Sequence, residues 1–367
     1  MDKKIDIIIP VYKAHDVLGR ALDSVKYQTI VDKIQITLVN DHCPEGSYDT
    51  FIQEYKDFFD IREIVMGRNV GPGYCRQHGV DNTDNEYFFF LDADDMIMNP
   101  FGLQLLLETM EDYPSAVMSF APVCEENKTG GMVYVECDTS WVFGRLFRRS
   151  FIQESNIRFI TSRSNEDVLY LLLVRFALAG IPNCVRLLQQ PIYAKRFSVG
   201  SISGENDQAF EHDYNFIGYV NSVILASLMG IKNNCLQEEI ESVVFNCFLY
   251  IWMTYNMAII NRPELEKQNW EHVKKYYYYL HDYINYIPDD IQTSLKITNF
   301  LKDYYMDASD RQTPYSMKVE LATFCSRLAE EEYDPATIYE IYGNDVQNEY
   351  KVREEQLFQT LRSEIDG

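Results

Sequence analysis

Short, continuously apolar runs alternate with stretches of helical pattern through the first half of the chain. Helical patterns span about 17–27 and 48–59, and a third begins near residue 73. Strands that are apolar throughout and separated by helices are typical of a parallel sheet covered on both faces. The pattern therefore predicts an α/β fold, Rossmann-like with a mostly parallel sheet. The runs expected to form its strands are 5–10, 34–40, 61–66 and 86–91.

The pattern changes after residue 204. From about residue 210 to the end, long helical patterns predominate, strand-like runs are few, and prolines punctuate the helices. We therefore predict an α/β domain over 1–205 and an α-helical C-terminal domain over 206–367. The tyrosine run 276–279 lies on one of these helices, where such spacing is typical of a packed face. Whether this domain positions a substrate or forms a homo-oligomer stays open at this stage.

Composition narrows the range of partners. With 46% hydrophobic residues in 367, the chain can bury a sizeable core. A formal net charge of −23 disfavours binding to nucleic acid and to anionic lipid. More than half of this net negative charge lies in the predicted helical region. A nucleotide ligand remains compatible with this charge, because a bound divalent cation neutralises phosphates locally.

Several features predict a cytoplasmic protein without a transmembrane segment. The eight cysteines include no CxxC pair, and the six histidines show no metal-ligand spacing, which favours reduced thiols over disulfides or a zinc site. The N-terminus lacks the pattern of a signal peptide. Polar residues interrupt the apolar stretch 243–260, so we interpret it as a buried helix.

Acidic residues follow the fourth apolar run directly, as Asp92, Asp94 and Asp95. Ligands of parallel sheets bind at the carboxyl ends of the strands, where this turn is expected. Carboxylates this close repel one another unless a cation is present, and their oxygens suit Mg²⁺ or Mn²⁺, which also bind diphosphates. The alternative interpretation is a solvated acidic turn that caps the next helix.

Other polar residues are expected near the same edge. Asp41 follows the second apolar run, and the glycine-bearing loop between Arg68 and Arg76 leads into a helix. Such a loop lets backbone and arginine approach a phosphate-bearing ligand. Glu166 and Asp167 begin another helix, where acidic residues also simply complement the helix dipole.

The ordered segments PVYKA, VND, RNVGPGYCR, LDADD, NED and YAKRFSVGSIS resemble the family 2 glycosyltransferases with the GT-A fold, over about residues 1–205. The resemblance implies inverting transfer of a hexose or N-acetylhexosamine from a uridine diphosphate (UDP) sugar to a glycan or other hydroxyl acceptor. Mn²⁺ or Mg²⁺ would be the cofactor. The Gln-x-x-Arg-Trp motif of the family's processive members is not found, so we expect one sugar to be added per encounter.

The resemblance also implies roles for individual residues. Asp167 matches the catalytic base and Glu166 lies beside it, whereas Asp94, with Asp92, would ligate the metal. Trp141 would stack on the acceptor sugar, although a core position is the alternative. A role of His212 as a further metal ligand stays open. The implied donor-binding residues are Pro10, Val11, Tyr12, Asp41, Arg68, Arg76, Asp92, Lys195, Arg196 and Ser201.

The sequence departs from the family pattern at several of these segments, including Cys75 in place of a small residue. The second strand end continues as NDHCPEG where the family has a compact Asp-Gly-Ser turn, and Lys195 stands where an aromatic residue is common. Two other functions remain: a nucleotidyltransferase, and a catalytically silent module that binds a sugar nucleotide or glycan. A dinucleotide-dependent dehydrogenase is disfavoured, because no GxGxxG follows the first strand.

Overall fold

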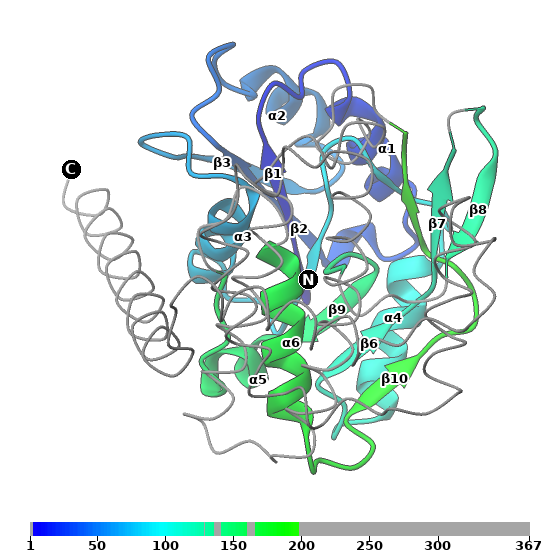
Figure 1. Ribbon diagram of the computed structural model, residues 1–367. Helices are drawn as coiled ribbons and strands as arrows, with labels where there is room; N and C mark the ends of the chain where they lie inside the picture. The colour runs from blue at the N-terminus through cyan, green and yellow to red at the C-terminus, as the bar shows by residue number, and fades with distance from the viewer. Residues whose placement is uncertain (1–2, 128, 136–140, 160–165, 198–367) are drawn as a thin grey trace, which may run out of the picture. The chain divides into compact units, whose positions relative to one another are not determined.

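The computed structural model describes residues 3–127, 129–135, 141–159 and 166–197 (Figure 1). In this part of the chain the strands form a seven-stranded sheet and a four-stranded sheet. The predicted helical domain over 206–367 lies outside the described residues, and so do Ser201, His212 and the tyrosine run 276–279.

The parallel half of the large sheet is built from the four predicted runs. They form β1 (Ile5–Val11), β2 (Ile34–Asn40), β3 (Asp60–Val65) and β4 (Tyr87–Phe90), each within one residue of the predicted ends. The order is β4-β1-β2-β3, and every neighbouring pair is parallel. All residues of β4 are buried, as are all but one of β1 and all but one of β2. The predicted parallel sheet is therefore confirmed.

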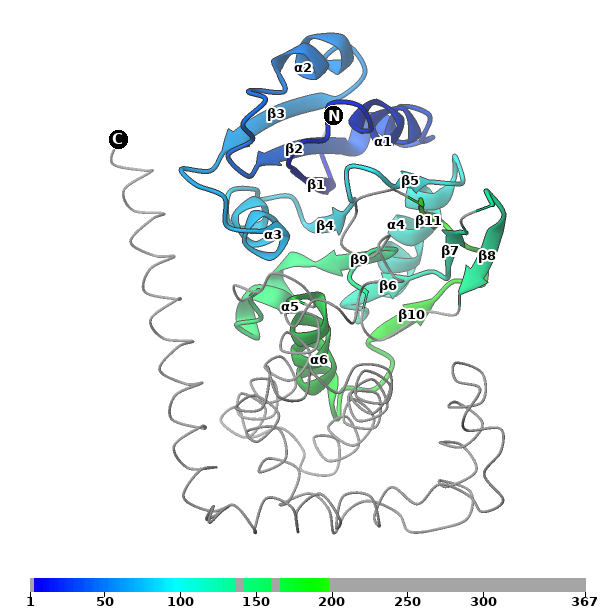
Figure 2. The same ribbon diagram turned by 45° about the horizontal axis from the view of Figure 1, so that its top comes forward.

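Helices cover this half of the sheet on both faces, as Figure 2 shows. The helices α1 (Leu18–Lys26) and α2 (Asp49–Tyr55) lie on one face, and α3 (Pro72–Asp81) packs against β1 and β2 on the other. The helix predicted over 48–59 is shorter than expected. The chain turns after Tyr55, which brings the ring of Phe59 back onto the Tyr55 ring at 5.8 Å and buries both.

The other half of the large sheet contains an antiparallel strand that the sequence did not predict. Here β9 (Arg145–Arg148) lies between β4 and β6 (Met118–Phe120) and is antiparallel to both. The edge strand β10 (Val185–Leu187) is parallel to β6. The remaining helical elements are η1 (Val31–Lys33), α4 (Gly102–Asp112), α5 (Arg149–Glu154) and α6 (Glu166–Leu178).

The small sheet connects distant segments beside the acidic turn. Its order is β5 (Met96–Ile97), β11 (Tyr193–Lys195), β7 (Val123–Glu126) and β8 (Met132–Val135). Because β5 directly follows the acidic turn, its antiparallel pairing with β11 brings the basic segment after Tyr193 next to that turn.

A buried ion pair fixes the N-terminal strand. Asp6 interrupts the apolar run of β1 and is fully buried, and its Oδ2 accepts a hydrogen bond from Arg149 Nη2 at 2.7 Å. Asn85 donates to both carboxylate oxygens. Burial raises the pKa of Asp6, although Arg149 and Asn85 oppose the shift. This pairing joins β1, α5 and the turn before β4.

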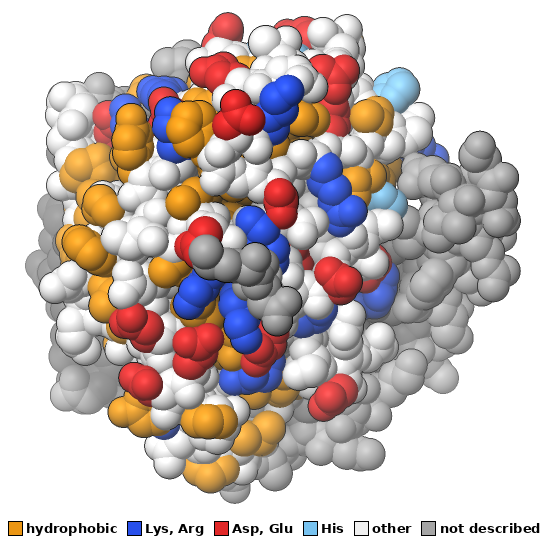
Figure 3. All heavy atoms as spheres, turned by 180° about the vertical axis from the view of Figure 1, so that it is seen from behind, with side chains coloured by type: hydrophobic (Ala, Val, Ile, Leu, Met, Phe, Trp, Pro, Cys, Tyr) orange, Lys and Arg blue, Asp and Glu red, His pale blue; other side chains and the backbone are white. Residues whose placement is uncertain are grey.

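The surface of the described residues is mixed in charge on the face shown in Figure 3, where basic and acidic side chains are interspersed. A face of this kind has no extended field of one sign to attract a polyanion. No helix among the described residues is long and apolar enough to span a membrane.

Candidate active site

The first part of the site is formed where β1 and β2 end. The backbone N–H of Asp41 donates to the Val11 carbonyl at 3.0 Å. Tyr12, which follows Val11 in the chain, is exposed. The Asp41 carboxylate is buried and accepts hydrogen bonds from the backbone N–H groups of Val70 (2.6 Å) and Gly71 (2.9 Å). Asp41 therefore holds the glycine-bearing loop against the end of β2.

Gly71 allows this loop to enter α3. It is the N-cap of the helix and has φ of +87°, a left-handed conformation that favours glycine. Pro72 then occupies the first turn, where its missing N–H is not needed. The sequence thus explains locally how α3 begins close to the strand ends. Arg68, before this turn, is exposed.

Arg76, on α3, joins the two acidic segments. Its Nη2 donates to Asp92 Oδ1 at 2.7 Å, and its Nη1 donates to Glu166 Oε1 at 2.6 Å. The Arg76 and Glu166 side chains are only 6% and 8% exposed, whereas that of Asp92 is 29% exposed. Burial acts to lower the pKa of Arg76, but Asp92 and Glu166 outweigh it and keep the guanidinium charged. Residues far apart in the sequence thus form one charged centre.

The three aspartates of the acidic turn have different environments. Asp95 is buried, and its carboxylate accepts hydrogen bonds from Tyr193 Oη (2.6 Å) and the Arg196 backbone N–H (2.8 Å). The same hydroxyl accepts the Asp92 N–H at 3.1 Å. Asp95 therefore fixes the turn onto β11, whereas the sequence predicted Asp94 and Asp92 as the metal ligands.

Asp94 fits a metal ligand best among the three. Its side chain is partly buried, and burial, reinforced by the charge of Asp92, raises its pKa. None of the hydrogen bonds or ion pairs found between described residues joins its carboxylate to another side chain. Asp94 and Asp92 would hold a divalent ion, whose charge would offset the repulsion between the two carboxylates.

The second acidic pair lies at the first turn of α6. Glu166 is buried and fixed by Arg76, whereas Asp167 is partly buried and its Oδ1 accepts the Val168 N–H at 3.0 Å. Burial raises the pKa of Asp167 well above its ordinary value, and Glu166 adds to the shift while Arg76 opposes it. A carboxylate in this environment is a stronger base than an exposed aspartate.

The basic residues after β11 pair with carboxylates of β7. Lys195 Nζ lies 2.7 Å from Glu125 Oε1, and Arg196 Nε donates to Glu126 Oε2 at 2.7 Å. The hydrogen bond from Arg196 lowers the pKa of Glu126. Sequence reasoning missed both glutamates, because they become relevant only through the pairing of β7 with β11.

Trp141 lies beside Lys195. The Lys195 ammonium is 5.0 Å from the centroid of the Trp141 ring, and Phe143 packs on the same ring at 5.3 Å. Trp141 is partly buried against the hydrophobic core. Its packing with Phe143 agrees with the core alternative, and its exposed part remains near the basic segment.

Taken together, a parallel sheet with an inserted antiparallel strand, an acidic turn after β4 and an acidic pair opening α6 define a GT-A type domain. A family model described as Glycosyl transferase family 2 matches residues 6–164, and the chain contains a domain of this family. The match covers most of the parallel sheet and the acidic turn.

Curated relatives support the same class. The chain is 24% identical over 303 residues to the poly(ribitol-phosphate) beta-glucosyltransferase of Bacillus spizizenii, covering 78% of this chain and 46% of that protein. It is 30% identical over 137 residues to the glycosyltransferase GlyA of Streptococcus pneumoniae, covering 36% of this chain and 19% of that protein. The chain thus spans less than half of the length of either relative.

Solved structures show the fold. The match to S. aureus TarS 1-349 in complex with UDP-GlcNAc has a TM-score of 0.61 at 14% identity, covering 82% of this chain and 85% of that one. The same fragment in complex with UDP matches with a TM-score of 0.59 at 14% identity, covering 83% of this chain and 87% of that one. These matches confirm the predicted GT-A fold.

Proposed function

We propose that the protein is a non-processive, inverting glycosyltransferase that moves a hexose or N-acetylhexosamine from a UDP-sugar to a hydroxyl acceptor. The single observation that carries the proposal is the bridge made by Arg76. The Arg76 guanidinium forms ion pairs both with Asp92 in the acidic turn after β4 and with Glu166 in the acidic pair that opens α6. The two acidic segments therefore lie next to each other. Such a transfer needs carboxylates that hold a metal beside the donor diphosphate and a carboxylate base beside the acceptor hydroxyl, and the two must lie close together.

The residues present fit a divalent metal, Mn²⁺ or Mg²⁺. Asp94 and Asp92 would hold it, since Asp94 is a partly buried carboxylate whose pKa is raised by burial and by the charge of Asp92. When bound, the ion supplies positive charge to the departing diphosphate. We assign Asp95 to holding the turn in place, since its two oxygens accept hydrogen bonds from Tyr193 and Arg196.

The base in this proposal is Asp167. Its carboxylate takes the proton of the acceptor hydroxyl as the oxygen attacks the anomeric carbon, and the C–O bond to the diphosphate breaks. Glu166, held by Arg76, keeps the first turn of α6 in place and helps to bind the acceptor or sugar. The raised pKa of Asp167 suits a base that works near neutral pH.

Donor binding would use the edge formed by β1 and β2. Pro10 and Val11 end β1 and Tyr12 follows it. Asp41 holds the glycine-bearing loop that carries Arg68. In the structure both Asp41 oxygens accept backbone hydrogen bonds, so we assign Asp41 to shaping the uracil pocket.

The segment after β11 would lie near the diphosphate. Lys195 and Arg196 pair with Glu125 and Glu126 in the structure, and we propose that they exchange these partners for donor phosphates. Trp141, beside Lys195, would offer its exposed part to the acceptor sugar.

Names of the relatives indicate the kind of acceptor. The first relative is named as a poly(ribitol-phosphate) beta-glucosyltransferase. A glycan or polyol phosphate polymer with free hydroxyls is therefore the acceptor class to test first. The region 206–367 would position this acceptor or mediate self-association.

A donor panel tests the proposal. The full chain is incubated with several nucleotide sugars and Mn²⁺, and the released nucleotide, pyrophosphate and heat of binding are measured. We expect UDP binding only with metal and its loss in Asp94→Ala, whereas Asp167→Asn retains binding but loses turnover by orders of magnitude. Release of pyrophosphate would indicate a nucleotidyltransferase, and binding without turnover a silent module. Equal loss of binding in both variants would overturn the assigned roles.

A further inference from the structure

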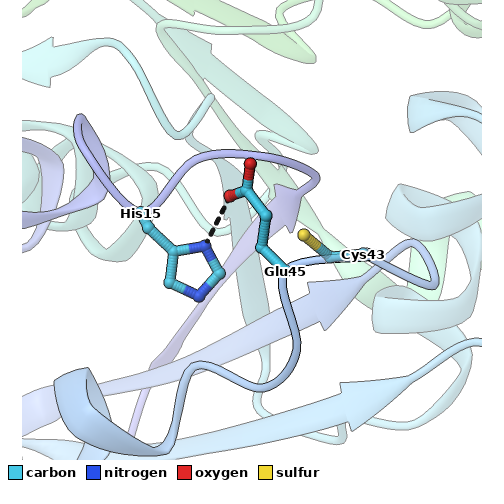
Figure 4. Close-up of side chains that lie close together, drawn as sticks. All are labelled: His15, Cys43 and Glu45. Atoms are coloured by element: carbon cyan, nitrogen blue, oxygen red, sulfur yellow. Dashed lines mark hydrogen bonds and ion pairs between the residues drawn. The ribbon is translucent and has the colours of Figure 1, made fainter.

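A second group of metal-ligating side chains lies in the loops after β1 and β2. His15 follows β1, and Cys43 and Glu45 belong to the loop after β2 (Figure 4). One ligand atom from each of the three lies within 4.8 Å of the other two, and no other set of three His, Cys, Asp or Glu residues among those described meets this criterion. The group thus combines nitrogen, sulfur and oxygen donors from two loops.

The hydrogen bonds of His15 leave one ring nitrogen facing a carboxylate. Nε2 lies 3.1 Å from the Ser47 carbonyl oxygen, which can only accept, so Nε2 carries a hydrogen. In a neutral imidazole Nδ1 then presents a lone pair, and it lies 3.1 Å from Glu45 Oε2, another acceptor. Two acceptors at this distance repel each other unless a proton or a cation lies between them.

Cys43 completes the set with an accepting sulfur. The Lys13 backbone N–H donates to its Sγ at 3.3 Å, and the Tyr48 hydroxyl donates at 3.8 Å. Two donors therefore face the sulfur, an environment that suits a metal-bound thiolate. Tyr48 also stacks on the His15 ring, with centroids 4.1 Å apart and planes inclined by 11°, which fixes the imidazole.

We propose that His15, Cys43 and Glu45 form a Zn²⁺ site that fastens the loop after β1 to the loop after β2. Zinc takes imidazole nitrogen, thiolate sulfur and carboxylate oxygen at about 2.0–2.3 Å, so its tetrahedral ligands lie about 3.3–3.7 Å apart. His15 Nδ1 and Glu45 Oε2 are 3.1 Å apart, and Cys43 Sγ lies within 4.8 Å of a ligand atom of each. Because the Glu45 side chain is 53% exposed, it can move closer to Cys43 when an ion binds. Water would occupy the fourth position.

The site is chemically distinct from the donor metal site. Asp92 and Asp94 offer only oxygen and suit a hard cation, whereas a thiolate selects a softer one. The zinc site therefore does not rest on the proposed function, and failure of either proposal leaves the other testable. Its expected effect is on the shape of the strand-end loops next to Tyr12 and Asp41.

Cobalt substitution tests the proposal. The full chain is stripped with chelator and titrated with Co²⁺, and near-ultraviolet absorption reports thiolate–cobalt bonding. We expect this band in the wild type and in the control Cys184→Ser, whose buried cysteine directly precedes β10, several strands away from β1 and β2. Cys43→Ser should abolish the band. His15→Gln should weaken Zn²⁺ affinity by at least about 10-fold, the lower range seen even for indirect ligand partners.

Two results would overturn the inference. The first is a wild-type chain that takes up no Zn²⁺ in calorimetry, because the His15–Glu45 contact is then an ordinary imidazolium–carboxylate pair. The second is a cobalt–thiolate band that is unchanged in Cys43→Ser, because another cysteine then binds the ion. Circular dichroism of each variant distinguishes loss of the site from loss of the fold.

Discussion

Removal of the Arg76 charge tests the centre of the proposed site most directly. In Arg76→Met the side chain keeps much of its apolar stem but no longer compensates Glu166 and Asp92. The Arg76 and Glu166 side chains are 6% and 8% exposed, so solvent screens this pair little. Breaking one partner of a buried ion pair costs about 3–5 kcal/mol, because the remaining charge stays buried alone.

The assay is urea unfolding at neutral pH, followed by circular dichroism. Lys3→Met is the matched control, since Lys3 pairs with Asp60, whose side chain is 70% exposed, and surface pairs contribute about 0–1 kcal/mol. At acidic pH the destabilisation of Arg76→Met should shrink, because protonated carboxyl groups no longer need a positive partner. A loss at neutral pH no larger than that of the control would refute the assigned energetics of Arg76.

Arg76→Met also has a kinetic consequence. Arg76 opposes the upward shift of the Asp167 pKa, so its removal should raise that pKa further. Because the base works in its deprotonated form, the acidic limb of the kcat–pH profile should move to higher pH. Arg76→Lys keeps a charge but only part of the bridge, and it should move the limb less. An unmoved limb in Arg76→Met would show that Arg76 does not act on the base.

Three further outcomes follow from the packing of the site. Asp94→Asn should stabilise the metal-free protein by about 1 kcal/mol, measured by urea unfolding in the presence of chelator. Because burial raises the pKa of Asp94, the wild type loses stability as the pH rises through this pKa. The stability gained by Asp94→Asn should therefore grow with pH. Gly79→Ala should cost about 1–3 kcal/mol in thermal unfolding because its Cβ would overlap the side chain of Ile8, whereas Gly19→Ala, with 3.8 Å to its nearest neighbour, should not destabilise. Tyr193→Phe should cost about 1–3 kcal/mol by removing a donor from buried Asp95, and an equal melting temperature would contradict this.

The parallel half of the sheet could be predicted because its strands are long apolar runs separated by helices. The antiparallel β9 and the small sheet could not be predicted in this way. Their strands contain two to four residues, too few for a periodic pattern, and their neighbours are set by pairing with distant segments. Asp6 shows the same limit, since its burial depends on Arg149, far along the chain.

For the candidate site as well, the sequence predicts what depends on strand ends but not what depends on contacts between distant residues. The positions of Asp41 and Asp92 at strand ends agree with the sequence, because the ends of parallel strands meet at one edge. The bridge by Arg76, the separate environment of Asp95 and the approach of His15 to Cys43 depend on side-chain directions in three dimensions. No spacing along the chain indicates them, and Ser201 and His212 lie outside the described residues.

Arg76 stabilises the acidic edge of the sheet by compensating two of its carboxylates. The negative charges of three carboxylates, Asp92, Glu166 and Asp167, raise the pKa of Arg76. Only Asp92 and Glu166 form ion pairs with Arg76. Burial and acidic neighbours also raise the pKa of Asp95, which Tyr193 and Arg196 hold by hydrogen bonds. Asp94 and Asp167 are the two carboxylates of the proposed reaction whose pKa values are raised in the same way. A metal on Asp94 and a substrate proton on Asp167 would each neutralise one of them, so ligand binding should stabilise this edge as well as use it.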